Sequence, residues 1–135
     1  ADFDLEGASV KGTFVSMGNP HLVLETAADA ARAVRTAPAL QASPRFPEGL
    51  NVGYCALGPD GVDLVVYERG AGLTEACGTG ACAAVAALVA RGRIAAGDPI
   101  EVRLPGGPLT ITWRPEGVLM RGPARRVFAG QLPEG

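Results

Sequence analysis

A cysteine at the expected start of an apolar helix is the residue of this sequence with the clearest chemical potential. Cys77 lies in the segment Ala76–Gly80, which reads Ala-Cys-Gly-Thr-Gly. The first amides of a helix lack partners within the helix and carry partial positive charge, and glycines leave them accessible, so a carboxylate can bind there. The same positive end would lower the pKa of a thiol from about 8.5 towards neutrality. The segment therefore predicts a carboxylate-binding site beside a reactive cysteine.

Glu68 is the acidic residue best placed to join this site from another segment. It ends an apolar run, precedes Cys77 by nine residues and is followed by Arg69 and Gly70. If the intervening loop folds back, the Glu68 carboxylate can reach the Cys77 thiol or a substrate amine. Taken alone, however, the Cys-Gly-Thr-Gly segment favours a structural interpretation, in which the glycines serve packing and the cysteine is a small buried hydrophobe.

The other polar candidates also have structural interpretations when each is taken alone. His21 is the one histidine of the sequence, and Asn19 lies in the Gly-Asn-Pro turn before it. The simplest interpretation makes His21 a hydrogen-bonded structural histidine and Asn19 a turn residue. Asn51 begins an expected strand, whereas Cys55 in that strand and Cys82 in the expected helix are interpreted as core residues.

Short strands joined by tight turns make up most of the sequence. They are predicted by alternation of apolar and polar residues and by turn signals such as Pro59-Asp60-Gly61. The expected strands are Val10–Met17, His21–Thr26, Asn51–Leu57, Val62–Arg69, Ile100–Leu104, Leu109–Trp113, Val118–Arg121 and Val127–Leu132. Thr26 is expected to cap a short helix over Ala27–Arg35 that ends before Pro38, and Pro38–Gly49 is expected to be a surface loop.

The segment Gly78–Gly92 differs from the rest because it is apolar on every side of a helix. Its side chains are mostly small, and Arg91 and Gly92 provide a favourable C-terminus. A helix without a polar face must be buried all round. The sequence therefore predicts an α+β fold, in which a curved, mostly antiparallel sheet or barrel wraps around one central buried helix.

The overall composition limits the class of protein. With 135 residues and 13.7 kDa, residues 1–135 are expected to form a single domain. Apolar residues make up 47% and charged residues 19%, which is enough to build a core. The net charge of -2 argues against nucleic-acid binding, and the uncharged apolar run Ala81–Ala90 is too short to cross a bilayer.

The cysteines and the N-terminal residues indicate a cellular setting. Three cysteines without a Cys-x-x-Cys pair, together with one histidine, argue against a disulfide framework or a metal site. The first residues show no basic segment followed by an apolar stretch, so no signal peptide is expected. These features predict a reduced, cytoplasmic protein.

Five motifs in a fixed order make the sequence similar to a known family. They are Gly18-Asn19-Pro20-His21; Phe46-Pro47 with Asn51-Val52; Glu68-Arg69-Gly70-Ala71-Gly72; Ala76–Ala84, which reads ACGTGACAA; and Leu104-Pro105-Gly106-Gly107. This series resembles the C-terminal half of diaminopimelate epimerase, and the resemblance extends from about Val15 to the end of the sequence.

The resemblance implies an amino-acid epimerase that needs no pyridoxal phosphate and no metal. In that family, two cysteines face the substrate α-carbon from opposite sides, so that one removes the α-proton and the other returns a proton to the opposite face. The reaction interconverts LL- and meso-diaminopimelate, on the route to lysine and peptidoglycan. The family fold has two similar lobes with the site in the cleft between them, and the expected strands and helix match one lobe.

The resemblance also implies a role for each candidate residue. Cys77 resembles one of the two proton-transfer thiols, Glu68 the acid beside that thiol and the substrate amine, and His21 the histidine that helps to activate the thiol of the other lobe. Two kinds of substrate ligand are implied as well, namely residues that hold the reacting α-carboxylate and residues that hold polar groups at the far end. The implied substrate-binding residues are Gly78 and Thr79 for the carboxylate, Glu68, and Asn19, Asn51 and Arg69 for the far end.

The sequence departs from the family pattern in two respects. It contains no Asn-Gly-x-x-x-Cys block of the kind that carries the other cysteine, and Leu73 stands where the family commonly has Glu. The two-base mechanism therefore requires either an N-terminal lobe absent from this sequence or a second copy of the chain in a homodimer. We expect a C-terminal lobe that acts on a small-molecule amino acid, with neither nucleic acid nor a membrane as a partner.

Other functions compete with this interpretation. One is a single lobe that binds an amino-acid carboxylate or a partner without turnover, which the missing second cysteine supports. Another is a proline-racemase-like isomerase, which shares the fold and uses cysteines, although the Gly-Asn-Pro-His and Glu-Arg-Gly-x-Gly motifs argue against it. A phenazine-biosynthesis-type isomerase also shares the fold, but it lacks the paired cysteines, so Cys77 argues against that function.

Overall fold

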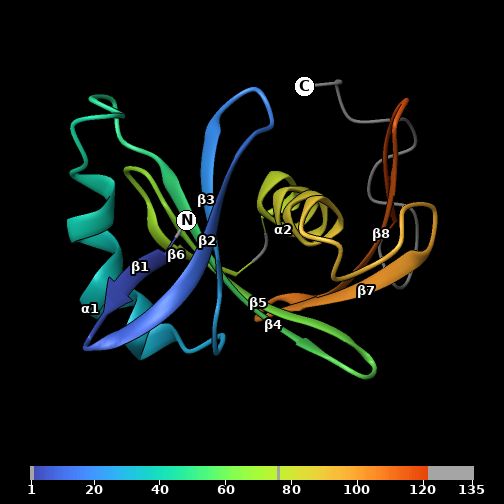
Figure 1. The fold of residues 1–135 in the computed structure, drawn as a ribbon, viewed down its shortest axis with the longest axis horizontal. Helices are drawn as coiled ribbons and strands as arrows, with labels where there is room; N and C mark the ends of the chain where they lie inside the picture. Colours follow the sequence, from blue (N-terminus) through green and yellow to red (C-terminus); the bar gives the residue numbers. More distant parts are fainter. Residues whose placement is uncertain (1, 76, 122–135) are drawn as a thin grey trace.

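A mixed sheet of nine strands and two helices make up the computed structural model, which describes residues 2–75 and 77–121 (Figure 1). In chain order the elements are β1 (Asp2–Leu5), β2 (Ala8–Ser16), β3 (Pro20–Glu25), α1 (Ala30–Gln41), β4 (Asn51–Gly58), β5 (Gly61–Glu68), β6 (Gly72–Thr74), α2 (Gly78–Ala90), β7 (Pro99–Leu104), β8 (Gly107–Arg114) and β9 (Gly117–Arg121). The predicted α+β class is confirmed, and every strand expected up to Arg121 is found. The strand expected over Val127–Leu132 lies outside the described residues.

The sheet combines hairpins with two parallel pairs. Its strands follow the order β1-β2-β3-β4-β5-β7-β8-β9, and β6 pairs with β5 outside this path. β3 and β4 are parallel, as are β5 and β7, whereas the other pairs are antiparallel. A parallel pair requires a crossover connection, and each crossover here contains a helix. α1 connects β3 to β4, and α2 lies between β5 and β7.

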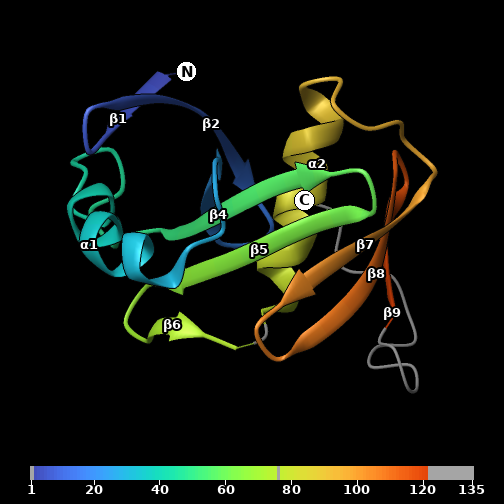
Figure 2. The same ribbon diagram turned by 90° about the horizontal axis from the view of Figure 1, so that it is seen from below.

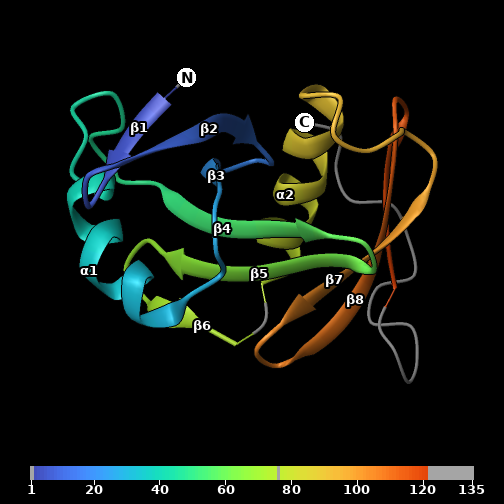
Figure 3. The ribbon, with the colours of Figure 1, turned by 60° about the horizontal axis from the view of Figure 1, so that its bottom comes forward.

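The two helices pack on opposite faces of the central strands. Successive side chains of β5 point to opposite faces of the sheet. Val62, Leu64 and Val66 are buried in the cluster around α2, whereas Val65 is buried in the cluster around α1. Figure 1, in which α2 is seen nearly end-on, shows β2 and β3 on one side of it, β4 and β5 below it, and β7 and β8 on the other side. Figure 2 and Figure 3 show α1 beside the ends of β4 and β5 that are distant from β7 and β8.

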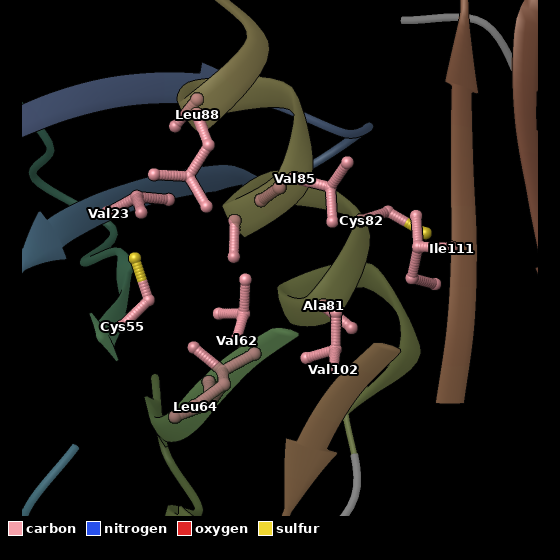
Figure 4. Close-up of a cluster of buried hydrophobic side chains, with 14 of the residues drawn as sticks. Val23, Cys55, Val62, Leu64, Ala81, Cys82, Val85, Leu88, Val102 and Ile111 are labelled. Atoms are coloured by element: carbon pink, nitrogen blue, oxygen red, sulfur yellow. The ribbon is translucent and has the colours of Figure 1, made fainter. Parts of the chain in front are cut away.

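α2 is buried along almost its whole length because its side chains are apolar and mostly small. The close-up in Figure 4 shows Ala81, Val85 and Leu88 of this helix among side chains from the surrounding strands. The buried residues of α2 are Gly80, Ala81, Cys82, Ala83, Ala84, Val85, Ala87 and Leu88. The prediction of a central buried helix is confirmed. Among residues 2–75 and 77–121, no helix is both long enough and apolar enough to cross a membrane.

The C-terminal end of α2 is fastened to the sheet by charged side chains. Glu25, the last residue of β3, forms an ion pair with each of two arginines: its Oε1 lies 3.2 Å from Arg91 Nη1, and its Oε2 accepts a hydrogen bond from Arg93 Nε at 2.8 Å. Gly92 between these arginines has a φ of 73°, the left-handed conformation expected after a helix. These ion pairs hold the C-terminal end of α2, and the buried residues Gly80, Ala81 and Cys82 hold the end where Cys77 lies.

The first helix differs from the prediction at both ends. Thr26 is not its cap; the Asp29 side chain accepts hydrogen bonds from the backbone nitrogens of Ala31 and Arg32. The helix also continues through Pro38 to Gln41, so the first residues of the expected Pro38–Gly49 loop are helical. Burial explains the extension, because α1 packs its small residues against the sheet and Gln41 Nε2 donates to Leu50 O at 2.9 Å. β1 and β6 are further elements that the sequence patterns did not predict.

Candidate active site

Cys77 is the N-cap residue of α2, at the helix start that the sequence predicts. Its φ of -140° and ψ of 100° are extended, and its Sγ accepts a hydrogen bond from Gly80 N at 3.2 Å. The Thr79 hydroxyl oxygen lies 3.7 Å from the same sulfur. An N-cap side chain normally satisfies one free amide of the first turn through an oxygen atom. Here the Cys77 sulfur does so, and the thiol therefore lies at the N-terminus of α2.

Gly80 makes this contact possible and is a position that the sequence reasoning did not identify as a site residue. A Cβ at residue 80 would lie 2.9 Å from Val66 Cγ2 and 3.0 Å from Cys77 Sγ, closer than side chains normally approach. The first residue of the helix is similarly confined, because a Cβ at Gly78 would lie 3.1 Å from Met120 Sδ. A glycine three residues after a candidate N-cap was the signal that could have singled out Gly80.

The thiol of Cys77 has a raised pKa. Only 8% of the residue is exposed, and this burial raises the pKa above the usual 9.0. The Gly80 N–H and the Thr79 hydroxyl lower the pKa, whereas the Glu68 carboxylate raises it further. The prediction that the helix end lowers the pKa towards neutrality is therefore wrong for this structure, because desolvation of the thiolate outweighs the helix contribution.

The loop after Glu68 folds back on β5. Gly70 and Gly72 adopt φ values of 82° and 76°, and β6 then pairs with the end of β5, so that Glu68 lies opposite Gly72. The β7–β8 turn holds the end of this loop, because Gly106 N donates to Glu75 O at 2.7 Å. Glu68 is consequently near enough to raise the pKa of the Cys77 thiol. The structure thus brings together these two residues, which the sequence places nine positions apart.

His21 approaches the same carboxylate from β3. It is only 2% exposed, and its Nε2 forms a hydrogen bond with Asn19 Oδ1 at 3.2 Å. Burial lowers the pKa of the ring below 6.5, while the negative charge of Glu68 raises it. The lowering dominates, so the imidazole is neutral at pH 7. Glu68 therefore interacts electrostatically with both His21 and Cys77.

Asn51 connects the first residue of β3 to the residue that follows β5. Its Nδ2 donates to Pro20 O at 3.4 Å, and its Oδ1 accepts from Arg69 N at 2.9 Å. The Arg69 guanidinium in turn donates from Nη1 to Glu48 O at 3.0 Å. Asn51 is buried, at 7% exposure, and lies directly opposite His21 in the parallel β3–β4 pair. Its amide therefore holds Pro20 and Arg69 in fixed positions on either side of β4.

Two hollows lie beside these residues. One of about 200 Å³ is lined by Phe14, Val15, Ser16, Pro20, His21 and Phe46. The other, of about 190 Å³, is lined by Pro20, Arg45, Phe46, Pro47, Glu48, Gly49 and Arg69. Pro20 and Phe46 are walls of both hollows, so His21 and Arg69 border neighbouring spaces. Cys77, Gly78 and Thr79 border neither hollow and lie at the start of α2 instead.

The other two cysteines are core residues, as predicted. Cys55 and Cys82 are fully buried, and burial raises the pKa of each thiol to about 12. All three cysteines are free thiols. In the part of the chain that the structure describes, no three His, Cys, Asp or Glu residues are grouped so that they could hold a metal ion.

The sequence matches one protein family and is similar to curated members of that family. The profile of the family described as diaminopimelate epimerase matches residues 13–127. The diaminopimelate epimerase of Ectopseudomonas mendocina (strain ymp) is 47% identical over 133 residues, which are 96% of this chain and 48% of the relative. The diaminopimelate epimerase of Xylella fastidiosa (strain M12) is 48% identical over 130 residues, which are 93% of this chain and 45% of the relative. The chain thus spans about half the length of the curated relatives that it matches.

Comparison with solved structures supports the fold. A hydroxyproline epimerase from Agrobacterium vitis, solved with bound trans-4-hydroxy-L-proline, superimposes with a TM-score of 0.62 at 22% identity. The superposition covers 83% of this chain and 39% of that structure. At this level of identity the likeness concerns the arrangement of strands around the buried helix and carries no statement about the ligand.

Proposed function

The chain belongs to the diaminopimelate epimerase family, and from this premise we propose that residues 1–135 form one lobe of an enzyme that interconverts LL- and meso-diaminopimelate. The lobe supplies one of two proton-transfer groups and uses neither pyridoxal phosphate nor a metal. The substrate is a small amino acid, and the reaction takes place in the cytoplasm, where thiols stay reduced.

The observation that carries the proposal is the position of Cys77 Sγ, which lies at the N-terminus of α2, bonded to Gly80 N–H and influenced by Glu68. An α-hydrogen is weakly acidic, so the carbanion formed by its removal must be stabilised by fixed dipoles in a closed site. The amides of Gly78 and Thr79 are such dipoles, and a substrate α-carboxylate bound to them would place the α-carbon next to the Cys77 sulfur.

The raised pKa makes Cys77 the proton donor in the resting lobe. After a second base has taken the α-proton from one face, the Cys77 S–H bond breaks and its proton forms the new C–H bond on the other face. The thiolate left behind is stabilised by the Gly80 N–H and the Thr79 hydroxyl, both of which lower the pKa of this thiol. In the reverse direction the thiolate removes the proton, and Glu68 holds the substrate amine beside it.

The remaining candidate site residues are proposed to bind the far end of the substrate or to assist the second base. His21 assists the thiol of the second base, and its neutral ring can accept a proton. Asn19, Asn51 and Arg69 are proposed to bind the polar groups at the far end; in support, Arg69 borders one hollow, and the hollow bordered by His21 shares two walls with it. Because Asn51 already bonds Pro20 O and Arg69 N, part of its contribution is to fix the positions of these neighbours.

The second base is proposed to come from outside residues 1–135. Cys55 and Cys82 are unsuited to the role, because their burial and pKa values of about 12 keep them protonated within the core. The partner that provides it is an N-terminal lobe like the other half of the curated relatives, or a second copy of the chain in a homodimer. In this proposal residues 1–135 are a single lobe, and either of these partners completes its site.

A binding module without turnover is the second candidate function. It is favoured by the raised pKa of Cys77, because a thiol that stays protonated can line a carboxylate site without exchanging a proton. The two functions differ in one measurable property, which is incorporation of solvent deuterium at the substrate α-carbon.

The test follows the α-proton of LL-diaminopimelate by NMR in D2O, with the reduced chain and with the N-terminal half of a curated relative added in trans. We expect exchange with the reconstituted pair and its loss in Cys77→Ser. Cys82→Ala, which removes a core thiol from the same helix, is the matched control and should retain exchange. Binding without exchange in the reconstituted pair would instead assign the module function, and exchange unaffected by Cys77→Ser would overturn the role of Cys77. Exchange with inversion at the α-carbon by the chain alone would identify a second copy as the partner.

A further inference from the structure

The side chain of Asn19, in the turn before β3, is hydrogen-bonded to that of His21, the second residue of β3. Asn19 Oδ1 and His21 Nε2 lie 3.2 Å apart. An amide oxygen can only accept a hydrogen bond, so the ring nitrogen must be the donor. The contact therefore requires a proton on Nε2 of His21.

The turn holds Asn19 in place for this contact. Gly18 has a φ of 86°, a conformation that glycine adopts without strain, and Met17 N donates to Asn19 O at 3.0 Å. On the other side of Asn19, Pro20 O accepts from Asn51 Nδ2 at 3.4 Å. Both backbone neighbours of Asn19 are thereby fixed, so its half-buried side chain presents Oδ1 to the ring from a defined position.

The surroundings of the ring keep it neutral. Val15 of β2 and Asn51 of β4 lie opposite His21 in the sheet, and neither side chain carries a charge. Phe46 borders the same hollow from the loop before β4, and Glu68 at the end of β5 is the charged group that acts on the ring. Burial outweighs this carboxylate and lowers the pKa of His21. A neutral imidazole has one N–H and one lone pair, and fixing the N–H on Nε2 leaves the lone pair on Nδ1.

We propose that Asn19 is a positioning residue, which fixes His21 in the Nε2–H tautomer so that Nδ1 presents the lone pair able to accept a proton. The tautomer is inferred from the hydrogen bond alone, whereas the use of that lone pair to activate a thiol rests on the proposed function. The Asn19 amide nitrogen keeps its two N–H donors, so the same side chain can also bind the far end of the substrate.

The sequence allows a direct test, because His21 is the one histidine of the chain and gives a single imidazole signal. Long-range 1H–15N correlation NMR distinguishes a protonated ring nitrogen from one with a lone pair. At pH 7.5 we expect Nε2 to be protonated and Nδ1 unprotonated. Asn19→Ala should move both 15N shifts towards a mixture of tautomers, whereas Ser16→Ala, a neighbour at the same hollow, should leave them unchanged.

A second variant keeps the test informative if Asn19→Ala fails to fold. Asn19→Asp retains the acceptor oxygen and adds a negative charge, so we expect the Nε2–H tautomer to persist and the pKa of His21 to rise by about 1. Protonation at Nδ1 in the unmodified chain, or the same 15N shifts in Asn19→Ala, would overturn the proposal. An unchanged pKa in Asn19→Asp would overturn it too. None of these readouts requires epimerase activity, so failure of the proposed function would leave the tautomer assignment standing.

Discussion

The sulfur of Cys77 lies 3.2 Å from the backbone nitrogen of Gly80 and closes the first turn of α2. One atom is therefore both the cap of a buried helix and the proposed proton-transfer group. A hydrogen bond to an ionised acceptor is stronger than one to its neutral form, so this contact favours the thiolate. Burial opposes the thiolate and is the larger effect, so the pKa of Cys77 is raised.

Gly80→Ala should weaken both the helix cap and the fold. The new Cβ would lie 2.9 Å from Val66 Cγ2, and overpacking of this kind costs about 1–3 kcal/mol, of which helix propensity returns up to about 1 kcal/mol. We expect a net loss of about 1 kcal/mol in the free energy of unfolding, measured by urea denaturation. Gly58→Ala is the control, because the nearest atom to its Cβ, Gly61 O, is 3.8 Å away. Equal stability of the two variants would contradict the close contact at Gly80.

Glu68→Gln should lower the pKa of two groups at once. The Glu68 carboxylate raises the pKa of both the Cys77 thiol and the His21 ring, so its neutralisation acts in the same direction on each. We expect faster alkylation of Cys77 by iodoacetamide at pH 8 and a lower His21 titration midpoint by NMR. The exposed Glu116→Gln serves as the control. If alkylation slows in Glu68→Gln, the carboxylate does not act on the thiol as a negative charge.

Glu25→Gln should loosen the far end of α2. The Glu25 side chain is 17% exposed and pairs with both Arg91 and Arg93, so it is better shielded than an ordinary surface pair. We expect the free energy of unfolding to fall by about 1 kcal/mol. Glu101→Gln, which removes the more exposed contact with Arg103, should change stability by less than about 0.5 kcal/mol. A loss in Glu25→Gln no larger than in this control would show that the two arginines do not fasten the helix.

The lowered pKa of His21 should make stability depend on pH below neutrality. The unfolded chain, in which the ring has its ordinary pKa near 6.5, binds a proton more readily than the folded chain. Stability from the neutral ring is therefore complete above pH 6.5 and is lost as the pH falls from 6.5 to the lower folded value. The slope is at most about 1.4 kcal/mol per pH unit. Urea unfolding at pH 5.0, 6.0 and 7.5 should show it, and His21→Gln should remove it; an unchanged slope in His21→Gln would assign it to other groups.

Much of the site was predictable because local chemistry determines it. Apolar side chains on every face require that α2 be buried, and the glycines after Cys77 mark the helix start. The sequence could not predict that the loop after Glu68 folds back. This fold depends on the short strand β6 and on the hydrogen bond from Gly106 N to Glu75 O. Such pairing joins residues that are far apart in sequence, and no local pattern encodes it.

The pKa of Cys77 and the extent of α1 could not be predicted for a common reason. Each depends on burial, which is a property of the assembled sheet. A helix end lowers a thiol pKa when solvent can reach the sulfur, but Cys77 is 8% exposed. Likewise, the conformational preferences of proline predict that the helix ends before Pro38. The fully buried Ala33 and Ala37 nevertheless hold α1 against the sheet, and the helix continues to Gln41. The parallel β3–β4 and β5–β7 pairs were not predicted either, since strand patterns do not reveal direction.

The side chains of β5 alternate between the two hydrophobic clusters, and this arrangement has a consequence for how the chain unfolds. Because β5 contributes to both clusters, it cannot separate from one cluster without exposing the other. The two clusters should therefore unfold as one cooperative unit. The chain contains a probe for each side, because Trp113 packs against the cluster around α2 and Tyr54 is buried in the cluster around α1. Coincident transitions of the Trp113 and Tyr54 signals would establish a single unit, and separate midpoints would show that each helix forms its own.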